Sequence, residues 1–296
     1  MRNRRLLCTI ALLFTLTIVA AACGGTKTTS TGGGGGEPAA NDLLAKIKED
    51  GVLRVSTDPN YAPQSFLNND GEMAGFDVDV ANEIARRLGV EVEWKTPRWG
   101  TIISGHWGDR WDVSVGSMTP LPERQEVLFF TPPYRYDPVG VAVHSDNTTV
   151  QDIATDLDGA TIGTCGGCTY QYYVEKTLSA PGLQVDFLID DATVKTYETD
   201  LNAVSDLSLG DGTRLDAVIS TVSVLQGAEK AGKPIKLVGD PIFGEPVSVA
   251  VDRSAALDPT SFTEELTKIV NQMAQDGTLT DISMKWYDED KTKAPA

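Results

Sequence analysis

The chain has 296 residues and carries 42 acidic against 25 basic side chains, a formal net charge of −17 at pH 7. Phosphate contacts need clustered lysine and arginine, so this balance argues against nucleic acid as a partner and against a peripheral hold on anionic lipid. The length allows one large domain, or two of ordinary size, once the N-terminal segments are set aside.

Residues 1–41 predict export and attachment to a membrane. Residues 1–22 begin with three arginines and continue as an apolar run that ends in small residues, the pattern of a signal peptide. The run is too short and too early for a membrane span. Cleavage before Cys23 would leave its thiol to carry the lipid anchor of a lipoprotein; an ordinary secretory signal with an incidental cysteine is the alternative. Residues 23–41, rich in glycine and threonine, predict a flexible tether, and plain disordered padding would have the same composition.

From residue 42 onward, short β-branched runs alternate with helical patterns. Val80, Ile84 and Leu88 repeat every four residues, which predicts a buried helix face, opened by Asp77 as the N-cap and closed by Gly89. Such alternation of strands and helices indicates a mostly parallel α/β sheet. In chain order we predict strands at 52–56, 90–94 and 111–115, with helices at 77–88 and 99–107.

The pattern restarts after an apolar run at 139–143, and a similar run at 246–251 closes it. Two such runs around a self-contained α/β unit predict an inserted second lobe, joined to the first by two crossing strands. In open α/β sheets ligands lie beyond the carboxyl ends of the strands, so two facing lobes would hold a ligand between them. We predict strands at 160–163, 184–188 and 217–220, and helices at 170–178, 200–209, 222–231, 259–275 and 279–287. The resulting parts are a first lobe of 42–141 and 249–290, a second lobe of 142–248, and a disordered tail of 291–296.

The run that ends at Arg124 predicts a cradle for a small carboxylate. The hydroxyls of Ser117 and Thr119 precede the arginine by seven and five positions, and two prolines lie between. A guanidinium presents a rigid fork of donors that matches a carboxylate in two parallel bonds, and hydroxyls add donors to the same anion. The alternatives are a surface ion pair of Arg124 with a neighbouring glutamate and strand-end capping by Ser117.

Three segments together resemble a known family. In chain order they are Leu53–Pro63 (LRVSTDPNYAP), Gly75–Ala85 (GFDVDVANEIA) and Ser117–Arg124 (SMTPLPER). They resemble the extracellular solute-binding proteins of ABC importers, family 3, which bind polar amino acids, and the resemblance runs from about residue 44 to about residue 287. It implies a type II periplasmic-binding-protein fold of two α/β lobes, with two hinge strands and a ligand cleft between the lobes. It also implies an ABC transporter permease as partner, a monomer, and neither cofactor nor metal.

The resemblance assigns ligand contacts in the first lobe one position at a time. Arg124 matches the carboxylate-binding arginine, and Ser117 and Thr119 match positions that donate to the same carboxylate. Asp58 and Tyr61 follow the first strand, where the family contacts its ligands, although an aspartate before proline equally starts a turn.

Further matches concern an aromatic cover and the second lobe. Trp99 matches an aromatic residue that covers the ligand, whereas Trp107 and Trp111 are expected to pack in the core. The loop 163–169 (GTCGGCT) matches the family's ligand loop at a helix start. There, backbone N–H groups and Thr169 would meet the carboxylate from the other side, and Cys168 stands where the family has Ser or Thr.

Cys165 and Cys168 are open to two interpretations. On the ligand loop of an exported binding protein they predict a disulfide that staples the loop. Their Cys-Gly-Gly-Cys spacing at a strand-to-helix junction is also typical of a thiol–disulfide oxidoreductase. A metal site is poorly supported, because His106 and His144 lie far away in the sequence.

The chain departs from the family at Thr221. The family has an aspartate there that pairs with the ligand's α-ammonium. Asp58 or Glu245 would then bind the ammonium, or the ligand is not an ordinary α-amino acid. Glu198 and Asp200 are expected to be surface or capping residues.

Together these features predict a substrate-binding lipoprotein of an ABC importer, anchored by lipid on the extracytoplasmic face of the membrane. Its ligand is a small polar carboxylate, an amino acid above all, captured by lobe closure. Two other functions stay open at this point: a thiol–disulfide oxidoreductase acting through Cys165 and Cys168, and a sensory module that presents a ligand to a receptor. No order of Ser, His and Asp offers other chemistry, so a non-enzymatic role is expected.

Overall fold

The computed structural model describes residues 41–181 and 183–294. The predicted signal peptide, the lipidation of Cys23 and the predicted tether up to residue 40 lie outside these residues. Within the described part of the chain, no helix is long and apolar enough to cross a membrane.

The first lobe is built on a parallel sheet in which β1 pairs with β5 on one side and β6 on the other. Helices α1, α2, α9 and α10 bury apolar residues against this sheet in one hydrophobic core. The elements of this lobe are α1 (Leu43–Asp50), β1 (Val52–Ser56), β2 (Asn60–Tyr61), β3 (Ser65–Leu67), β4 (Met73–Ala74), α2 (Phe76–Leu88), β5 (Glu91–Lys95), α3 (Trp99–Ile103), β6 (Val113–Met118), α4 (Pro122–Val127), β7 (Leu128–Phe130), α9 (Thr260–Gln275) and α10 (Thr278–Tyr287).

The second lobe has a sheet covered on both faces. Residues that alternate along β11 belong to two different hydrophobic cores, one with α5 and α6 and the other with α7 and α8. This explains why β11 is buried at every position, as in strands of sheets that are covered on both sides. Its elements are α5 (Ile153–Asp156), β9 (Thr161–Cys165), α6 (Thr169–Val174), β10 (Thr193–Tyr197), α7 (Asp200–Leu207), β11 (Ala217–Thr221) and α8 (Val222–Lys230).

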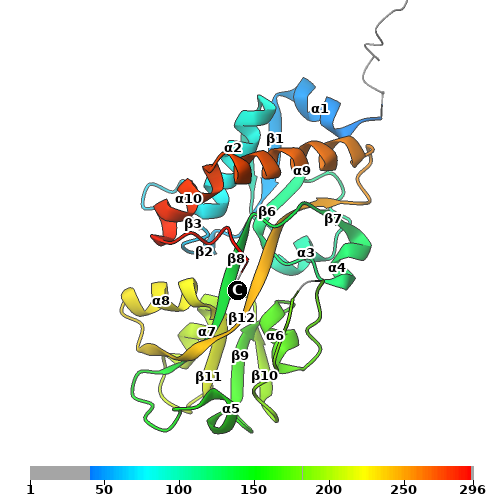
Figure 1. The fold of residues 1–296 in the computed structure, drawn as a ribbon. Coiled ribbons are helices and arrows are strands. Elements are labelled where there is room, and N and C mark those ends of the chain that lie inside the picture. The colour runs from blue at the N-terminus through cyan, green and yellow to red at the C-terminus, as the bar shows by residue number, and fades with distance from the viewer. Residues whose placement is uncertain (1–40, 182, 295–296) are drawn as a thin grey trace, which may run out of the picture. The chain divides into compact units, whose positions relative to one another are not determined.

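Two long antiparallel strands, β8 (Arg135–His144) and β12 (Ile235–Asp252), connect the lobes (Figure 1). The sheet order is β10-β9-β11-β8-β12-β6-β1-β5, with β7 also paired to β12. β12 pairs with β8 as far as Val247 and with β6 and β7 from Ser248 onward. The predicted α/β architecture with two hinge strands is therefore confirmed, whereas the residue bounds of the two lobes stay a prediction.

Helix α2 begins one residue earlier than predicted and has a different cap. Gly75 is the N-cap, with φ of 131°, and Asp77 lies inside the first turn as a fully buried residue. A Cβ at Gly75 would lie 2.3 Å from the carbonyl oxygen of Gln64, so only glycine fits. The prediction that Asp77 caps the helix was wrong, because its carboxylate is held by Arg135 and Tyr134 instead. The predicted end at Gly89 is confirmed.

Four other predictions were wrong. The helix expected at 170–178 ends at Val174, and Lys176 just beyond it has positive φ. The helix expected to run to residue 107 ends at Ile103, because Gly105 and His106 both have positive φ. No strand forms at 184–188, where the hydroxyl of Tyr173 donates to the carbonyl of Asp186 and accepts from the N–H of Leu188. The strand that pairs with β9 is β10 instead. The disordered tail does not begin at residue 291, since Lys291 is buried and its carbonyl accepts from β8.

Candidate ligand-binding site

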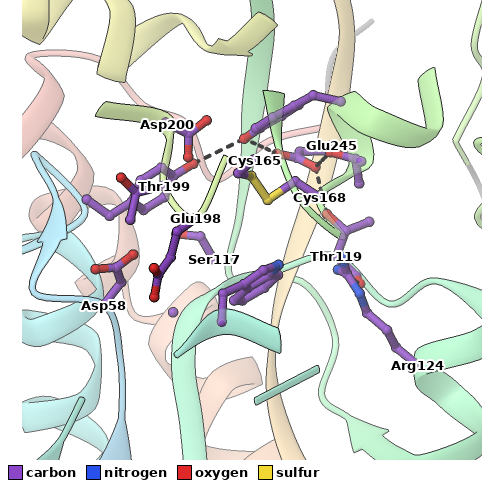
Figure 2. A pocket seen from close by; sticks show the side chains of 15 residues that line it. Asp58, Ser117, Thr119, Arg124, Cys165, Cys168, Glu198, Thr199, Asp200 and Glu245 are labelled. Atoms are coloured by element: carbon purple, nitrogen blue, oxygen red, sulfur yellow. Dashed lines mark hydrogen bonds between the residues drawn. A yellow bond between two sulfur atoms is a disulfide. The ribbon is translucent and has the colours of Figure 1, made fainter. Parts of the chain in front are cut away.

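A pocket with an empty volume of about 490 Å³, part of it open to solvent, lies between the lobes (Figure 2). From the first lobe it is lined by the predicted residues Asp58, Tyr61, Trp99, Ser117, Thr119 and Arg124. From the second lobe it is lined by the predicted Cys168 and Thr169, and also by Tyr170, Glu198, Thr199 and Asp200. Glu245 of β12 completes the wall. The structure therefore brings together all the residues that were predicted to contact the ligand, except Thr221.

Arg124 is buried at the pocket wall, with 3% of its surface exposed. One guanidinium nitrogen donates to the carbonyl of Thr119 at 2.8 Å and the other to the carbonyl of Gly167, in the second lobe, at 2.6 Å. The guanidinium carbon lies 5.2 Å from the ring centroid of Trp99. Desolvation by burial lowers the pKa of Arg124, and its Nε has no hydrogen-bond partner among the described residues. A desolvated cation with an unused donor favours an anion at this wall.

Glu245 is a buried carboxylate beside Arg124. Its Oε2 accepts from the hydroxyls of Thr119 at 2.9 Å and Thr169 at 2.6 Å, and its Oε1 accepts from Tyr170 at 3.2 Å. The hydroxyls of Thr119 and Thr169 were predicted to donate to a ligand's carboxylate. In this structure they donate to the carboxylate of Glu245 instead. Desolvation raises the pKa of Glu245 to about 7, an effect increased by the charge of Asp137 and opposed by the hydroxyls and by Arg124.

This elevated pKa predicts a specific pH dependence of stability. Between the ordinary value of 4.5 and about 7, the unfolded chain ionises Glu245 while the folded protein keeps it protonated. The free energy of unfolding should therefore fall as the pH rises through this window, by on the order of 1–3 kcal/mol from this group. Glu245→Gln should remove that part of the slope, measured by urea denaturation at several pH values. An unchanged slope would show that Glu245 does not titrate there.

Thr221 lies behind the pocket rather than on its wall. It is fully buried, and its hydroxyl is 3.4 Å from that of Tyr61, which in turn is 3.1 Å from that of Tyr170. A chain of hydroxyls thus runs from Thr221 to Glu245, since Tyr170 also donates to the glutamate. The position at which the family has an aspartate is therefore occupied by the neutral Thr221. The only ionisable carboxyl group on this chain of hydrogen bonds is that of Glu245.

The hydroxyl of Ser117 is already in use. It donates to Asp77 at 2.6 Å and accepts from Arg135 at 2.6 Å, while the backbone N–H of Ser117 donates to Tyr134. A hydroxyl has a single proton to donate. In this structure Ser117 therefore lines the pocket without a free donor, held in a left-handed conformation with φ of 56°.

Cys165 and Cys168 form a disulfide on the pocket wall. The loop between them carries Gly167, whose φ is 75° and whose added Cβ would lie 2.8 Å from Cδ1 of Ile103 in the first lobe. The disulfide therefore closes a tight turn whose glycine lets the lobes approach and presents a carbonyl to Arg124. Cys165 is buried and Cys168 is half-buried, so exposure does not separate the two interpretations; the stapling interpretation is supported by the place of the bond on the loop that Arg124 contacts.

The second lobe adds two acidic residues at the carboxyl end of β10. Thr199 is the N-cap of α7, and Asp200, the next residue, is buried with 6% of its surface exposed. The expectation that Asp200 is a surface or capping residue was wrong. Glu198 is exposed and forms an ion pair of 3.1 Å with Arg98 of the first lobe. The position after a strand of an α/β sheet is the sequence feature that could have identified both residues as pocket-lining.

The described residues also limit the chemistry of the site. Among them, no group of three or more His, Cys, Asp and Glu side chains is arranged to hold a metal ion.

Trp107 and Trp111 pack in the core, as predicted, with ring centroids 5.3 Å apart.

Comparisons with known proteins match almost the whole described chain. The model of the bacterial extracellular solute-binding proteins, family 3, matches residues 53–289. The chain is 30% identical over 260 residues to the L-cystine-binding protein TcyJ of Escherichia coli (strain K12), covering 86% of this chain and 90% of that protein. Among solved structures, an ancestral arginine-binding protein bound to arginine is 30% identical with a TM-score of 0.67, covering 80% of this chain and 98% of that one. A mutant of ArgBP from T. maritima is 25% identical with a TM-score of 0.70, covering 83% and 99%. The chain therefore belongs to the bacterial extracellular solute-binding proteins, family 3.

Proposed function

We propose that this protein is the substrate-binding component of an ABC importer, that it captures an amino acid or a related small carboxylate, and that it is not an enzyme. The observation that carries the proposal is the buried Arg124 on the wall of a pocket shared by two hinged lobes. The relatives support the ligand class, since their names describe proteins that bind cystine and arginine.

The same proposal places the protein outside the cytoplasm. Family membership supports an extracytoplasmic location, and the signal-like segment supports export. We further propose that Cys23 carries a lipid anchor and that an ABC transporter permease receives the ligand. In this arrangement the lipid keeps the two lobes close to the permease.

Side-chain contacts already join the lobes around the pocket, which supports capture by closure. Arg124 reaches Gly167, Tyr61 meets Tyr170, and Gln64 donates to Ser223 at 2.8 Å. A charge-assisted hydrogen bond contributes about 1.5–3 kcal/mol, and micromolar affinity needs about 8 kcal/mol. The guanidinium and the displacement of water by closure supply most of that range, because the N–H groups of Gly166, Gly167 and Cys168 already donate within the protein.

A thermal-shift panel tests the proposal. The purified protein is heated with each of the standard L-amino acids, cystine and a set of opines. At a ligand concentration about 100 times Kd, binding stabilises the folded state by about 2.7 kcal/mol, which predicts a rise in Tm of about 5–10 °C for a body of this size. D-glucose is a matched uncharged control and should have no effect. If no amino acid, cystine or opine raises Tm, the proposed ligand class is wrong.

A further inference from the structure

A second cavity lies between the lobes, and no described residue lines both it and the ligand pocket. Its empty volume is about 1090 Å³, part of it open to solvent, compared with about 490 Å³ for the ligand pocket. The first lobe contributes α10 and the chain after it, and the second lobe contributes α8 (Figure 1). Much of the wall is apolar, with Pro63, Leu201, Val224, Ala228 and Trp286 among its residues. The second cavity therefore has the room and the apolar surface to bind an organic molecule.

The charges on the wall of the second cavity have the opposite sign to the net charge of the chain. Three lysines line it: Lys230 and Lys233 at the end of α8 and just beyond, and Lys291 in the C-terminal segment. Glu289, which is exposed, is the only acidic side chain among the described residues of this wall. The whole chain, in contrast, has a formal net charge of −17. A local excess of positive charge in an acidic protein favours an anion at this place.

The burial of Lys291 is an independent observation that indicates a ligand. Only 8% of its surface is exposed, although it lines the second cavity. Its ammonium group lies 4.5 Å from the ring centroid of Tyr287 and forms no hydrogen bond with a described residue. Burial lowers the pKa of Lys291, and the charges of Asp137 and Glu289 oppose this effect from a distance. A buried ammonium group has three protons to donate, so one without an acceptor on a cavity wall indicates a place for an acceptor from a ligand.

We infer that the second cavity binds a small organic anion with an apolar body, an aromatic carboxylate or sulfonate, whose charged group accepts hydrogen bonds from Lys291. The apolar wall covers the body of this molecule, and Lys230 and Lys233 add positive charge from the other lobe. The anion therefore contacts both lobes. The inference goes beyond the proposed function and does not depend on it, because no residue of the ligand pocket takes part.

Two fluorescent dyes that differ in one group test the inference. 8-Anilinonaphthalene-1-sulfonate carries an anionic sulfonate, and N-phenyl-1-naphthylamine has the same aromatic body without it. Each dye is titrated into the purified protein near neutral pH and followed by its fluorescence. A single molecule of the sulfonate dye should bind per chain, about 10-fold or more tightly than the neutral dye, which is the effect of one charge-assisted hydrogen bond. Equal affinity of the two dyes, or no binding of the sulfonate dye, would contradict the inference.

Lysine variants assign the effect to the second cavity. Lys291→Met removes the charge with little change in the size of the side chain. It should weaken the binding of the sulfonate dye about 10-fold or more, while the affinity for the neutral dye changes less than about 2-fold. Lys230→Gln combined with Lys233→Gln, both at exposed positions, should weaken the sulfonate dye about 2- to 5-fold. Lys268→Met is the matched control: it removes an exposed lysine of α9 outside the cavity and should change neither affinity.

Arg124→Gln separates the second cavity from the ligand pocket, and it should leave the affinity for the sulfonate dye unchanged. If Arg124→Gln weakens the sulfonate dye and the lysine variants do not, the dye binds in the ligand pocket and the inference is wrong. If Lys291→Met does not fold, the combined variant of Lys230 and Lys233 decides, and an unchanged affinity there contradicts the inference. The proposed function is tested separately, by the thermal-shift panel.

Discussion

Arg124→Gln is expected to weaken ligand binding by about 100-fold or more while the protein stays folded. The guanidinium supplies the only basic group among the described residues that line the pocket, and two lost charge-assisted hydrogen bonds at about 1.5–3 kcal/mol each correspond to that factor or more. Arg124→Lys keeps the charge but not the fork of donors, so its affinity should lie between those of the wild type and the glutamine variant. Isothermal titration with the best ligand of the panel measures both.

The fold should survive this change, because the contacts of the guanidinium are two backbone carbonyls and the face of Trp99, and the amide of glutamine can still donate to a carbonyl. Arg86→Gln is the matched control: it removes the same group from an arginine whose side chain is 70% exposed on α2, and it should leave affinity unchanged. If Arg124→Gln and the wild type bind the ligand with equal affinity, the ligand's carboxylate does not bind at this wall of the pocket.

Arg135→Met should destabilise the folded protein strongly. Arg135 is fully buried at the start of β8 and pairs with Asp77 at 3.3 Å and Asp137 at 2.6 Å, both fully buried as well. Removing the cation leaves Asp77 buried without a counter-charge and Asp137 with only the charge of Lys291 nearby, which costs about 3–5 kcal/mol. Urea denaturation measures the change in the free energy of unfolding, and Tm should drop by roughly 10 °C.

Two further measurements show whether the unpaired charges cause the loss. Adding Asp137→Asn to Arg135→Met should recover part of the stability, since one orphaned charge is removed. The deficit should also shrink as the pH falls, because a buried carboxylate that has lost its cation favours the protonated form. Arg86→Met, in an exposed pair with Glu83, should cost less than about 1 kcal/mol. If Arg135→Met also lowers the free energy of unfolding by less than about 1 kcal/mol, the buried ion pairs of Arg135 with Asp77 and Asp137 contribute little to stability.

The fold could be predicted from the sequence where a hydrophobic repeat marks the buried face of a helix and a glycine marks its end. The four-residue repeat of α2 and its end at Gly89 depend on local geometry, and the structure has both. The false strand at 184–188 shows the limit of this reasoning. Its backbone groups are partly satisfied by the hydroxyl of Tyr173, a residue more than ten positions away, and no local pattern records such a contact.

The candidate site was predictable as a set of positions but not as a network of hydrogen bonds. Short motifs identified Arg124 and its neighbours as residues of one pocket. They did not show that Ser117 donates to Asp77, or that Thr119 donates to Glu245, because both partners lie far away in the sequence. Asp200 was missed because an aspartate after threonine at a helix start has the composition of a cap, and only burial distinguishes the two roles.

The bond between Cys165 and Cys168 has a practical consequence for anyone who prepares the protein. In a reducing cytoplasm the two sulfurs remain thiols, so the turn that presents Gly167 to Arg124 loses its covalent clamp. Protein purified from that compartment then contains both the thiol and the disulfide form. Its ligand-binding curves therefore depend on how the sample was handled. Secretion of the recombinant chain, or a thiol count before each assay, turns this variable into a known quantity.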